Sequence, residues 1–206
     1  MVLARSLARQ LARPRGIAGR LLGGAMDKAN RRPTELALDL LSPRDGEAIL
    51  DAGCGTGAAM AGAIERADVH VTGLDPSAEM IAAARRRLSG WRWAELDQAP
   101  IEDMPFADES FDGILLLNVL YFSGPDGDMI ANLHRVLKPG GRLVVYVTHR
   151  DTMERWPFAR AGYHRLFDAP KLFGVIRQGG FCADRISVRE VPIARSVRGL
   201  LARATR

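Results

Sequence analysis

Short apolar runs and longer amphipathic segments alternate along most of the chain. Four apolar runs occupy residues 49–51, 69–74, 111–117 and 142–148, and a shorter one lies near residues 93–96. Runs of this kind are typical of strands that are buried on both faces of a parallel sheet. Because segments with helical periodicity separate them, the pattern predicts βα units and an α/β fold with a doubly wound sheet.

Helices are predicted between these strands and before them. They cover residues 34–41, 58–66, 78–88, 126–137 and 172–178. Pro33 marks the start of the first helix, and Pro14 with several glycines keeps the preceding segment loose. A turn is predicted at residues 138–141. The end of the chain is predicted to form an antiparallel pair of strands at residues 181–191 and 198–204.

A glycine-rich turn follows the first strand, within the sequence ILDAGCGTG of residues 49–57. Glycine tolerates positive φ and has no Cβ, so Gly53, Gly55 and Gly57 allow the backbone to touch a ligand directly. A strand, a glycine turn and a helix in this order are typical of a nucleotide-binding βα unit.

Two ligand classes fit this turn. Gly53, Gly55 and Ala58 satisfy the G-x-G-x-x-G/A pattern of dinucleotide-binding proteins, and Asp75 lies about where such proteins carry an acid. A nicotinamide-linked oxidoreductase is therefore one alternative. Against it, Asp51 ends the first strand, where a carboxylate would repel a pyrophosphate and would suit a cationic ligand.

Three features together resemble the class I S-adenosylmethionine-dependent methyltransferase family over residues 44–181. They are Asp51 before the glycines, Asp75-Pro76 before a new helix, and the stretch MPFADESFDGILLLNVL at residues 104–120. The phrase LKPGGRLVV at residues 137–145 adds to the resemblance. It implies a Rossmann-like seven-stranded sheet with one reversed strand and an N-terminal helical extension. It also implies S-adenosylmethionine as cofactor and a small-molecule, quinone-like or lipid-like acceptor.

The resemblance also implies which residues bind the methyl donor. The donor's ammonium accounts for Asp51, and its ribose diol accounts for Asp75, since two hydroxyl donors suit one two-oxygen acceptor. Many relatives carry an acid where this chain has Pro100, so contact with the adenine falls to the Ile101 backbone and Glu102. The full set of candidate donor-binding residues is Asp51, Gly53, Cys54, Gly55, Gly57, Asp75, Pro76, Met80, Ile101, Glu102 and Asn118.

Candidate catalytic residues follow the fourth and fifth strands. Tyr121 comes shortly after Asn118, and His149 follows the fifth strand, where imidazole could act as a base. An insert beyond it concentrates aromatic surface for the acceptor in Trp156, Phe158, Tyr163, His164 and Phe167. No cluster has metal-ligand spacing, so no catalytic metal is expected. A donor-binding protein of the same fold without methyl transfer remains an alternative.

Composition adds a domain boundary and a location. The 206 residues are enough for one α/β domain, at residues 44–206, with an extension at residues 1–43. No run of 18 apolar residues occurs, so no segment is expected to span a membrane. The two cysteines are Cys54 and Cys182, and the first lies inside the glycine turn. A structural disulfide is therefore not expected, which favours the reducing cytoplasm.

The net charge of +5 is concentrated near the start of the chain. Residues 1–32 carry eight basic side chains and one acid. Within them Leu3, Leu7 and Leu11 recur at helical spacing among arginines, which favours an amphipathic helix on an anionic membrane or over the substrate. A helix packed on the domain and an organelle transit peptide remain open. Nucleic acid is not an expected partner, because no aromatic residue accompanies the basic run.

Overall fold

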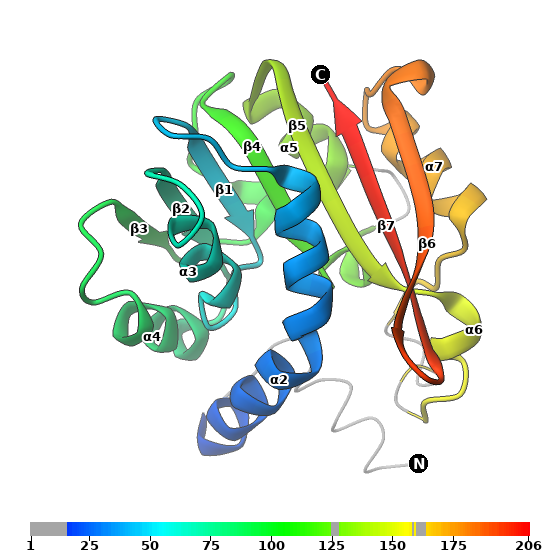
Figure 1. Ribbon diagram of the computed structural model, residues 1–206, viewed down its shortest axis with the longest axis horizontal. Helices are drawn as coiled ribbons and strands as arrows, with labels where there is room; N and C mark the ends of the chain where they lie inside the picture. The colour runs from blue at the N-terminus through cyan, green and yellow to red at the C-terminus, as the bar shows by residue number, and fades with distance from the viewer. Residues whose placement is uncertain (1–15, 125–127, 158, 160–163) are drawn as a thin grey trace.

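Seven strands form one mixed sheet in the computed structural model, which describes residues 16–124, 128–157, 159 and 164–206 (Figure 1). They are β1 (Ala48–Ala52), β2 (His70–Leu74), β3 (Ala94–Asp97), β4 (Phe111–Leu117), β5 (Leu137–Thr148), β6 (Ile186–Ala194) and β7 (Val197–Thr205). The predicted amphipathic segment around Leu3, Leu7 and Leu11 lies outside the described residues.

The strand order is β3-β2-β1-β4-β5-β7-β6. Neighbours from β3 to β5 pair in parallel, whereas β7 is antiparallel to both β5 and β6. This topology confirms the predicted α/β, Rossmann-like sheet with one reversed strand. The order reverses between β1 and β4, and ligands of open α/β sheets bind beyond the carboxyl ends of the strands at such a switch point.

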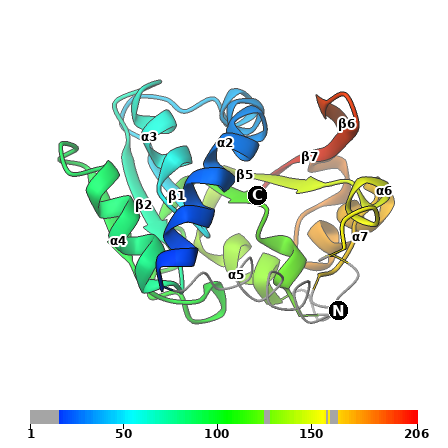
Figure 2. The same cartoon turned by 90° about the horizontal axis from the view of Figure 1, so that it is seen from below.

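Helices cover both faces of the sheet. They are α2 (Gly16–Leu41), α3 (Ala58–Ile64), α4 (Ala78–Arg87), α5 (Asp128–Val136), α6 (Arg150–Met153) and α7 (Ala169–Gln178), with short 3-10 turns η1 (Ile101–Asp103), η2 (Leu120–Phe122) and η4 (Ala183–Arg185). Figure 2 shows α3 and the C-terminal half of α2 on one side of the sheet and α5 and α7 on the other.

Alternate residues of the central strand serve these two layers. Leu115 of β4 packs in the cluster with α2 and α3, whereas Ile114 and Leu116 pack in the cluster with α5 and α7. All three are fully buried. Because successive strand residues point to opposite faces, a continuous apolar run is what a strand with helices on both sides requires.

The first helix differs from the prediction. A break was expected before Pro33, but α2 runs from Gly16 to Leu41 with Pro33 inside it. Proline removes one helical hydrogen bond. The turns after it, however, bury Ala37, Leu38 and Leu41 against the sheet. Such packing supplies most of a helix's stability in a folded protein and outweighs the local preference. The boundary at residue 43 stays a prediction.

Two strand boundaries also differ. The predicted turn at residues 138–141 lies within β5, which starts at Leu137 and pairs with Phe111 before the register shifts. Gly140, at φ 78°, makes this irregularity, and its N–H donates to the Arg206 carbonyl. Strand β6 begins at Ile186 and not at residue 181, because the preceding residues form the turn η4.

Candidate functional site

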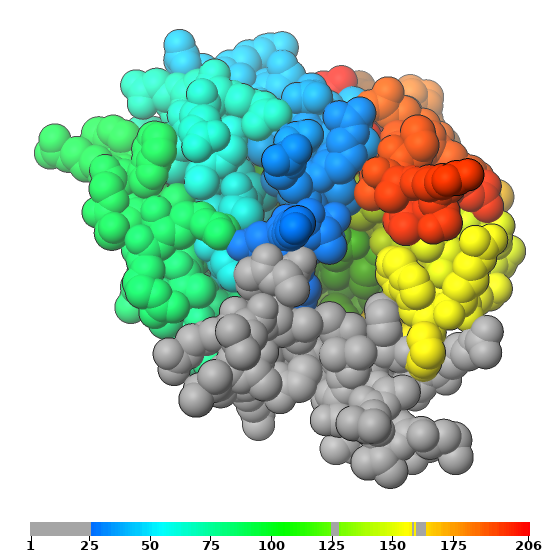
Figure 3. All heavy atoms as spheres, turned by 60° about the horizontal axis from the view of Figure 1, so that its bottom comes forward, coloured from blue at the N-terminus to red at the C-terminus, as the bar shows by residue number. Residues whose placement is uncertain are grey.

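A cavity of about 880 Å³ lies beyond the carboxyl ends of β1, β2 and β4. The glycine turn forms one wall, and α2 residues between Met26 and Leu38 form another. Figure 3 shows α2 in blue at the centre of this side of the molecule, flanked by the α3–α4 side in cyan and green. Met26 and Asn30 of α2 line the cavity.

All three glycines of the turn have positive φ, at 82° for Gly53, 52° for Gly55 and 77° for Gly57. Gly53 and Gly55 line the cavity. Gly57 does not, among the described residues, and instead precedes α3, where a Cβ would lie 3.1 Å from Ala84 and 3.2 Å from Leu88. Gly57 therefore allows the turn to approach α4, and its predicted contact with the donor stays a prediction.

Asp51 is the most unusual charged residue of the cavity. Its side chain is 2% exposed, and its Oδ2 atom has no hydrogen-bond partner among the described residues. Burial, and then the charge of Asp75, raise the pKa of Asp51 to about 7. A buried carboxylate without partners is unfavourable. The site therefore fits a ligand that brings a cationic N–H group, as the ammonium of S-adenosylmethionine does.

Asp75 also lines the cavity, at the carboxyl end of β2. Its Oδ2 accepts the Gly55 N–H at 3.0 Å, and its Oδ1 accepts the Ser77 N–H at 2.8 Å. Burial raises the pKa of Asp75, while these two hydrogen bonds oppose the rise. A carboxylate has about four acceptor positions, so each oxygen keeps one for a ligand hydroxyl. The arrangement fits a ribose diol.

Beyond Asp75 the cavity wall is mostly apolar. Pro76, Met80, Pro100 and Ile101 line it together with Glu102. Met80 and Ile101 are each 4% exposed, which gives a flat aromatic ring an apolar surface. Pro100 lines the cavity at the position where the family resemblance leads one to expect an acid. Glu102 is the acidic side chain at this end of the cavity.

Cys54 lines the cavity but is unsuited to act as a nucleophile. Burial and the charges of Asp51 and Asp75 raise the pKa of its thiol. The thiolate, which is the reactive form, is therefore disfavoured. Cys54 packs instead in the cluster of α2 and α3, and a Cβ on Gly73 would lie 2.9 Å from its Sγ.

Asn118 directly follows β4 and has a left-handed backbone, at φ 59°. This conformation is uncommon for residues other than glycine, although asparagine adopts it more readily than most. Asn118 lines the cavity, and its Nδ2 donates to Asn30 Oδ1 of α2 at 3.1 Å. The strand end and the helix are thus linked by two amide side chains.

A second link between α2 and the turn was not predicted. Thr56 Oγ1 donates to Asp27 at 2.6 Å, and Arg87 of α4 contacts both, at 2.7 Å from Thr56 Oγ1 and 2.6 Å from Asp27 Oδ2. The sequence places Thr56 beside the glycines but gives no sign of partners 29 and 31 residues away.

The two catalytic candidates lie outside the described lining of the cavity. Tyr121 is buried, and its hydroxyl donates to Asn118 Oδ1 at 3.0 Å and accepts the Thr148 N–H. Burial raises the pKa of Tyr121 well above its ordinary value. A buried phenol of this kind does not ionise near neutral pH, so Tyr121 contacts the site through Asn118.

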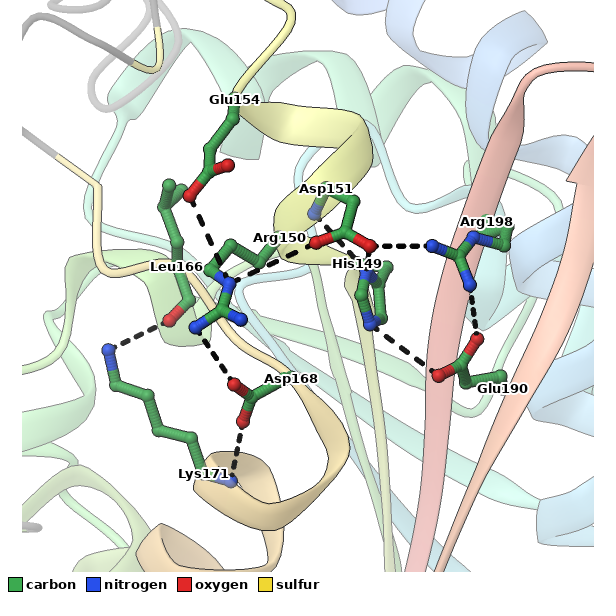
Figure 4. Close-up of polar contacts among 9 residues, drawn as sticks. All are labelled: His149, Arg150, Asp151, Glu154, Leu166, Asp168, Lys171, Glu190 and Arg198. Atoms are coloured by element: carbon green, nitrogen blue, oxygen red, sulfur yellow. Dashed lines mark hydrogen bonds and ion pairs between the residues drawn. The ribbon is translucent and has the colours of Figure 1, made fainter.

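His149 directly follows β5 and belongs to a polar network with residues of α6 and of the β6–β7 hairpin, shown in Figure 4. Its Nδ1 accepts the Asp151 N–H at 3.2 Å, and its Nε2 lies 3.6 Å from Glu190 Oε1. Arg198 bridges the two acids, at 2.7 Å from Asp151 and 2.8 Å from Glu190. His149 therefore caps α6 and joins it to the β6–β7 hairpin, and its role as a base stays a prediction.

The aromatic insert contributes to the core in part. Phe167 is fully buried, and His164 packs against Tyr121 and Phe122 with ring centroids 6.1 and 5.1 Å apart. Burial lowers the pKa of His164. Phe158 and Tyr163 lie outside the described residues. Across the described ranges, the cavity lining includes none of this insert.

The described part of the chain has neither a cluster of metal ligands nor a membrane-spanning helix. No group of three His, Cys, Asp or Glu side chains there could hold a metal ion. Every helix in those ranges is too short or too polar to cross a bilayer.

Comparison with known proteins gives a consistent result. A family described as a methyltransferase domain matches residues 50–145. The O-methyltransferase rstn1 of Aspergillus nomiae is 33% identical over 150 residues, which are 71% of this chain and 67% of that protein. The demethylmenaquinone methyltransferase of Clavibacter sepedonicus is 37% identical over 123 residues, which are 60% of this chain and 49% of that protein.

The fold has solved counterparts as well. The 1,6-didemethyltoxoflavin-N1-methyltransferase of Burkholderia thailandensis, solved with its acceptor and S-adenosylhomocysteine, matches with a TM-score of 0.72. The match covers 100% of this chain and 87% of that one at 21% identity, so it bears on the fold alone. The chain spans about half to two thirds of the length of the two curated relatives.

Proposed function

Because this chain belongs to the class I S-adenosylmethionine-dependent methyltransferase family, we propose that it transfers a methyl group from S-adenosylmethionine to a small or amphiphilic acceptor. The observation that carries the proposal is the pair of buried carboxylates beside the glycine turn, where Asp51 Oδ2 has no hydrogen-bond partner among the described residues. Such a site suits a ligand with an ammonium at one end and a diol at the other, and it does not suit a diphosphate.

The donor's sulfonium supplies an activated methyl group for in-line displacement, so positioning can account for much of the catalysis. In the proposal, Asp51 holds the amino-acid end, and Asp75 accepts the ribose hydroxyls. The apolar wall around Met80 and Ile101 takes the adenine. Asn118 and Asn30, at the junction of β4 and α2, then face the methyl group and the acceptor.

The acceptor class is supported by the lining near Asn118 and by the relatives. Met26, Val119, Phe122 and Met129 give this part of the cavity an apolar surface, which suits an aromatic or aliphatic ring. The relatives are named as an O-methyltransferase and as a demethylmenaquinone methyltransferase. We therefore propose a quinone-like, phenolic or lipid-like acceptor.

The basic N-terminal segment motivates a further part of the proposal, a cytoplasmic protein that binds anionic membranes peripherally. Full-length protein should sediment with vesicles containing phosphatidylserine, and a version lacking residues 1–20 should not, while both should bind the donor. Neutral vesicles are the control. Equal sedimentation of the two versions would remove the membrane part of the proposal and leave methyl transfer untouched.

Donor recognition itself can be tested without an acceptor. We expect Asp75→Ala to weaken the binding of S-adenosylhomocysteine by more than about 1 kcal/mol, the order of a lost charged hydrogen bond. Isothermal calorimetry measures the change. The matched control is Asp97→Ala, which removes a carboxylate from the next strand end, outside the described lining of the cavity.

A dinucleotide-binding site would respond differently in the same assay. A ligand that binds only the folded state raises the melting temperature, so S-adenosylhomocysteine should stabilise the protein and NAD should not. The opposite result, or equal affinities of wild type and Asp75→Ala, would overturn the proposed function.

A donor-binding protein that does not transfer methyl groups is the second candidate. It is favoured by one observation: the described lining residues include neither a histidine nor a tyrosine that could act as a base. Radiolabelled S-adenosylmethionine incubated with cell extract separates the two functions. Label that appears in an extractable product supports methyl transfer, and tight donor binding without any labelled product supports the alternative.

A further inference from the structure

A chain of hydrogen bonds connects β5 to the cavity. The Thr148 N–H donates to the Tyr121 hydroxyl, which donates to Asn118 Oδ1 at 3.0 Å. Asn118 Nδ2 then donates to Asn30 Oδ1 at 3.1 Å. The chain begins at a buried main-chain group and ends at two side chains that line the cavity.

The direction of this chain follows from its first member. A backbone N–H can only donate, so the Tyr121 oxygen must accept there. The phenolic proton points to Asn118 Oδ1 at 3.0 Å, and the Asn118 atom that accepts it must be an oxygen. If the Asn118 amide were reversed, the Tyr121 hydroxyl would face an amide nitrogen in place of this acceptor, and the two amide oxygens of Asn118 and Asn30 would face each other.

Backbone contacts fix the position of Asn118. Its N–H donates to the Tyr146 carbonyl at 2.9 Å, and its left-handed φ of 59° directs the strand end toward the cavity. The backbone thus sets where the amide lies, and Tyr121 sets which end of the amide faces which way.

We propose that Tyr121 is a positioning residue that fixes the polarity of the Asn118–Asn30 pair, so that the cavity presents N–H donors to an oxygen atom of the acceptor. Because the Oδ1 of Asn30 accepts from Asn118, the amide nitrogen of Asn30 is directed away from Asn118. That nitrogen makes no hydrogen bond to any residue in the described ranges. Asn118 Nδ2 also keeps a second N–H.

This polarity selects a substrate class, a step that rests on the proposed methyl transfer. A carbonyl, hydroxyl or phenolate oxygen accepts hydrogen bonds from such N–H groups, whereas a protonated amine would bring donors against donors. The acceptor is therefore recognised through an oxygen close to the methylated atom, and cationic amines are poor ligands for this part of the cavity.

The polarity itself can be tested without turnover. The chain has only three asparagines, Asn30, Asn118 and Asn132, so ¹⁵N-asparagine labelling gives three side-chain amide pairs in an NMR spectrum. Substitution of each residue assigns its pair. We expect Tyr121→Phe to shift or broaden the Asn118 and Asn30 pairs and to leave the Asn132 pair in place.

Ser123→Ala is the matched control. It removes a buried hydroxyl, two residues from Tyr121, that donates to the Leu120 carbonyl at 2.9 Å and does not line the cavity within the described ranges. This variant should leave the Asn30 pair unchanged. An Asn30 pair that ignores Tyr121→Phe, or that responds equally to both substitutions, overturns the positioning role. If Tyr121→Phe fails to fold, Asn118→Asp tests the same chain, because a carboxylate cannot donate to Asn30, and the Asn30 pair must then shift.

Two probes of similar shape test the substrate class. 1-Naphthol should shift the Asn30 pair in the wild-type protein, and 1-naphthylmethylamine, which is cationic at neutral pH, should not. An equal response to both probes, or none to naphthol, overturns the oxygen preference. Binding of S-adenosylhomocysteine is measured on the same sample, so failure of the proposed function is recognised separately.

Discussion

Asp51→Asn should weaken donor binding at least tenfold and, in the ligand-free protein, raise the free energy of unfolding. Both effects come from the same cause. Asp51 is 2% exposed, and its Oδ2 has no hydrogen-bond partner within the described ranges. In the absence of the donor, the ionised carboxylate of Asp51 has no ammonium to pair with and therefore destabilises the folded protein. Asparagine keeps the shape and removes the charge.

The pH dependence gives the sign of the stability change. Burial raises the pKa of Asp51 from 3.8 to about 7, so between these values the folded protein binds a proton that the unfolded chain does not. Stability contributed by this group is complete below pH 4 and is lost as the pH rises through 7. At pH 8 the substitution should therefore stabilise the protein by about 1–3 kcal/mol, and at pH 4 it should have little effect.

Donor affinity should change with pH in the opposite sense. The ammonium binds the ionised carboxylate, so affinity for S-adenosylhomocysteine should rise from pH 6 to pH 8 in the wild type and stay flat in Asp51→Asn. Calorimetry and urea unfolding measure the two quantities, and Asp97→Asn serves as the control. A variant that binds the donor normally, or that is less stable than wild type at pH 8, would contradict the assignment.

The part of the site that could be predicted is the part that is local in sequence. The glycines and the two acids follow strands, and the carboxyl ends of parallel strands meet at one edge of a sheet. Strand-end positions, together with the family resemblance, therefore predicted Asp51, Asp75 and Asn118 at the ligand site, and all three line the cavity.

What could not be predicted depends on contacts between distant segments. The continuity of α2 through Pro33 depends on how Leu38 and Leu41 pack on the sheet, which local preferences do not contain. Tyr121 lies only three residues beyond Asn118, but η2 turns its ring into the core. The direction of a side chain after a strand end depends on the backbone conformation of a single turn residue. The sequence alone does not specify that conformation.

The glycine turn is the other place where a single atom has a large effect. Gly53→Ala would place a Cβ 2.2 Å from Val119 Cγ2, at a backbone φ of 82°. The turn has little freedom to move away, because Gly53 N–H donates to the Leu74 carbonyl at 2.7 Å. Left-handed strain costs about 1–2 kcal/mol for a residue with a side chain, and overpacking adds about 1–3 kcal/mol.

We therefore expect Gly53→Ala to lower the free energy of unfolding by about 3 kcal/mol or more, and Gly55→Ala by about 1 kcal/mol. Gly55 is the matched control because its φ is also positive, at 52°, while no atom lies within 4 Å of its added Cβ. Combining Gly53→Ala with Val119→Ala removes both Cγ atoms from the clash. In urea unfolding, the double variant should therefore be less destabilised than the sum of its single changes. Equal costs at the two glycines, or strictly additive changes in the double variant, would mean that Gly53 is required for its conformation alone and not for its approach to the end of β4.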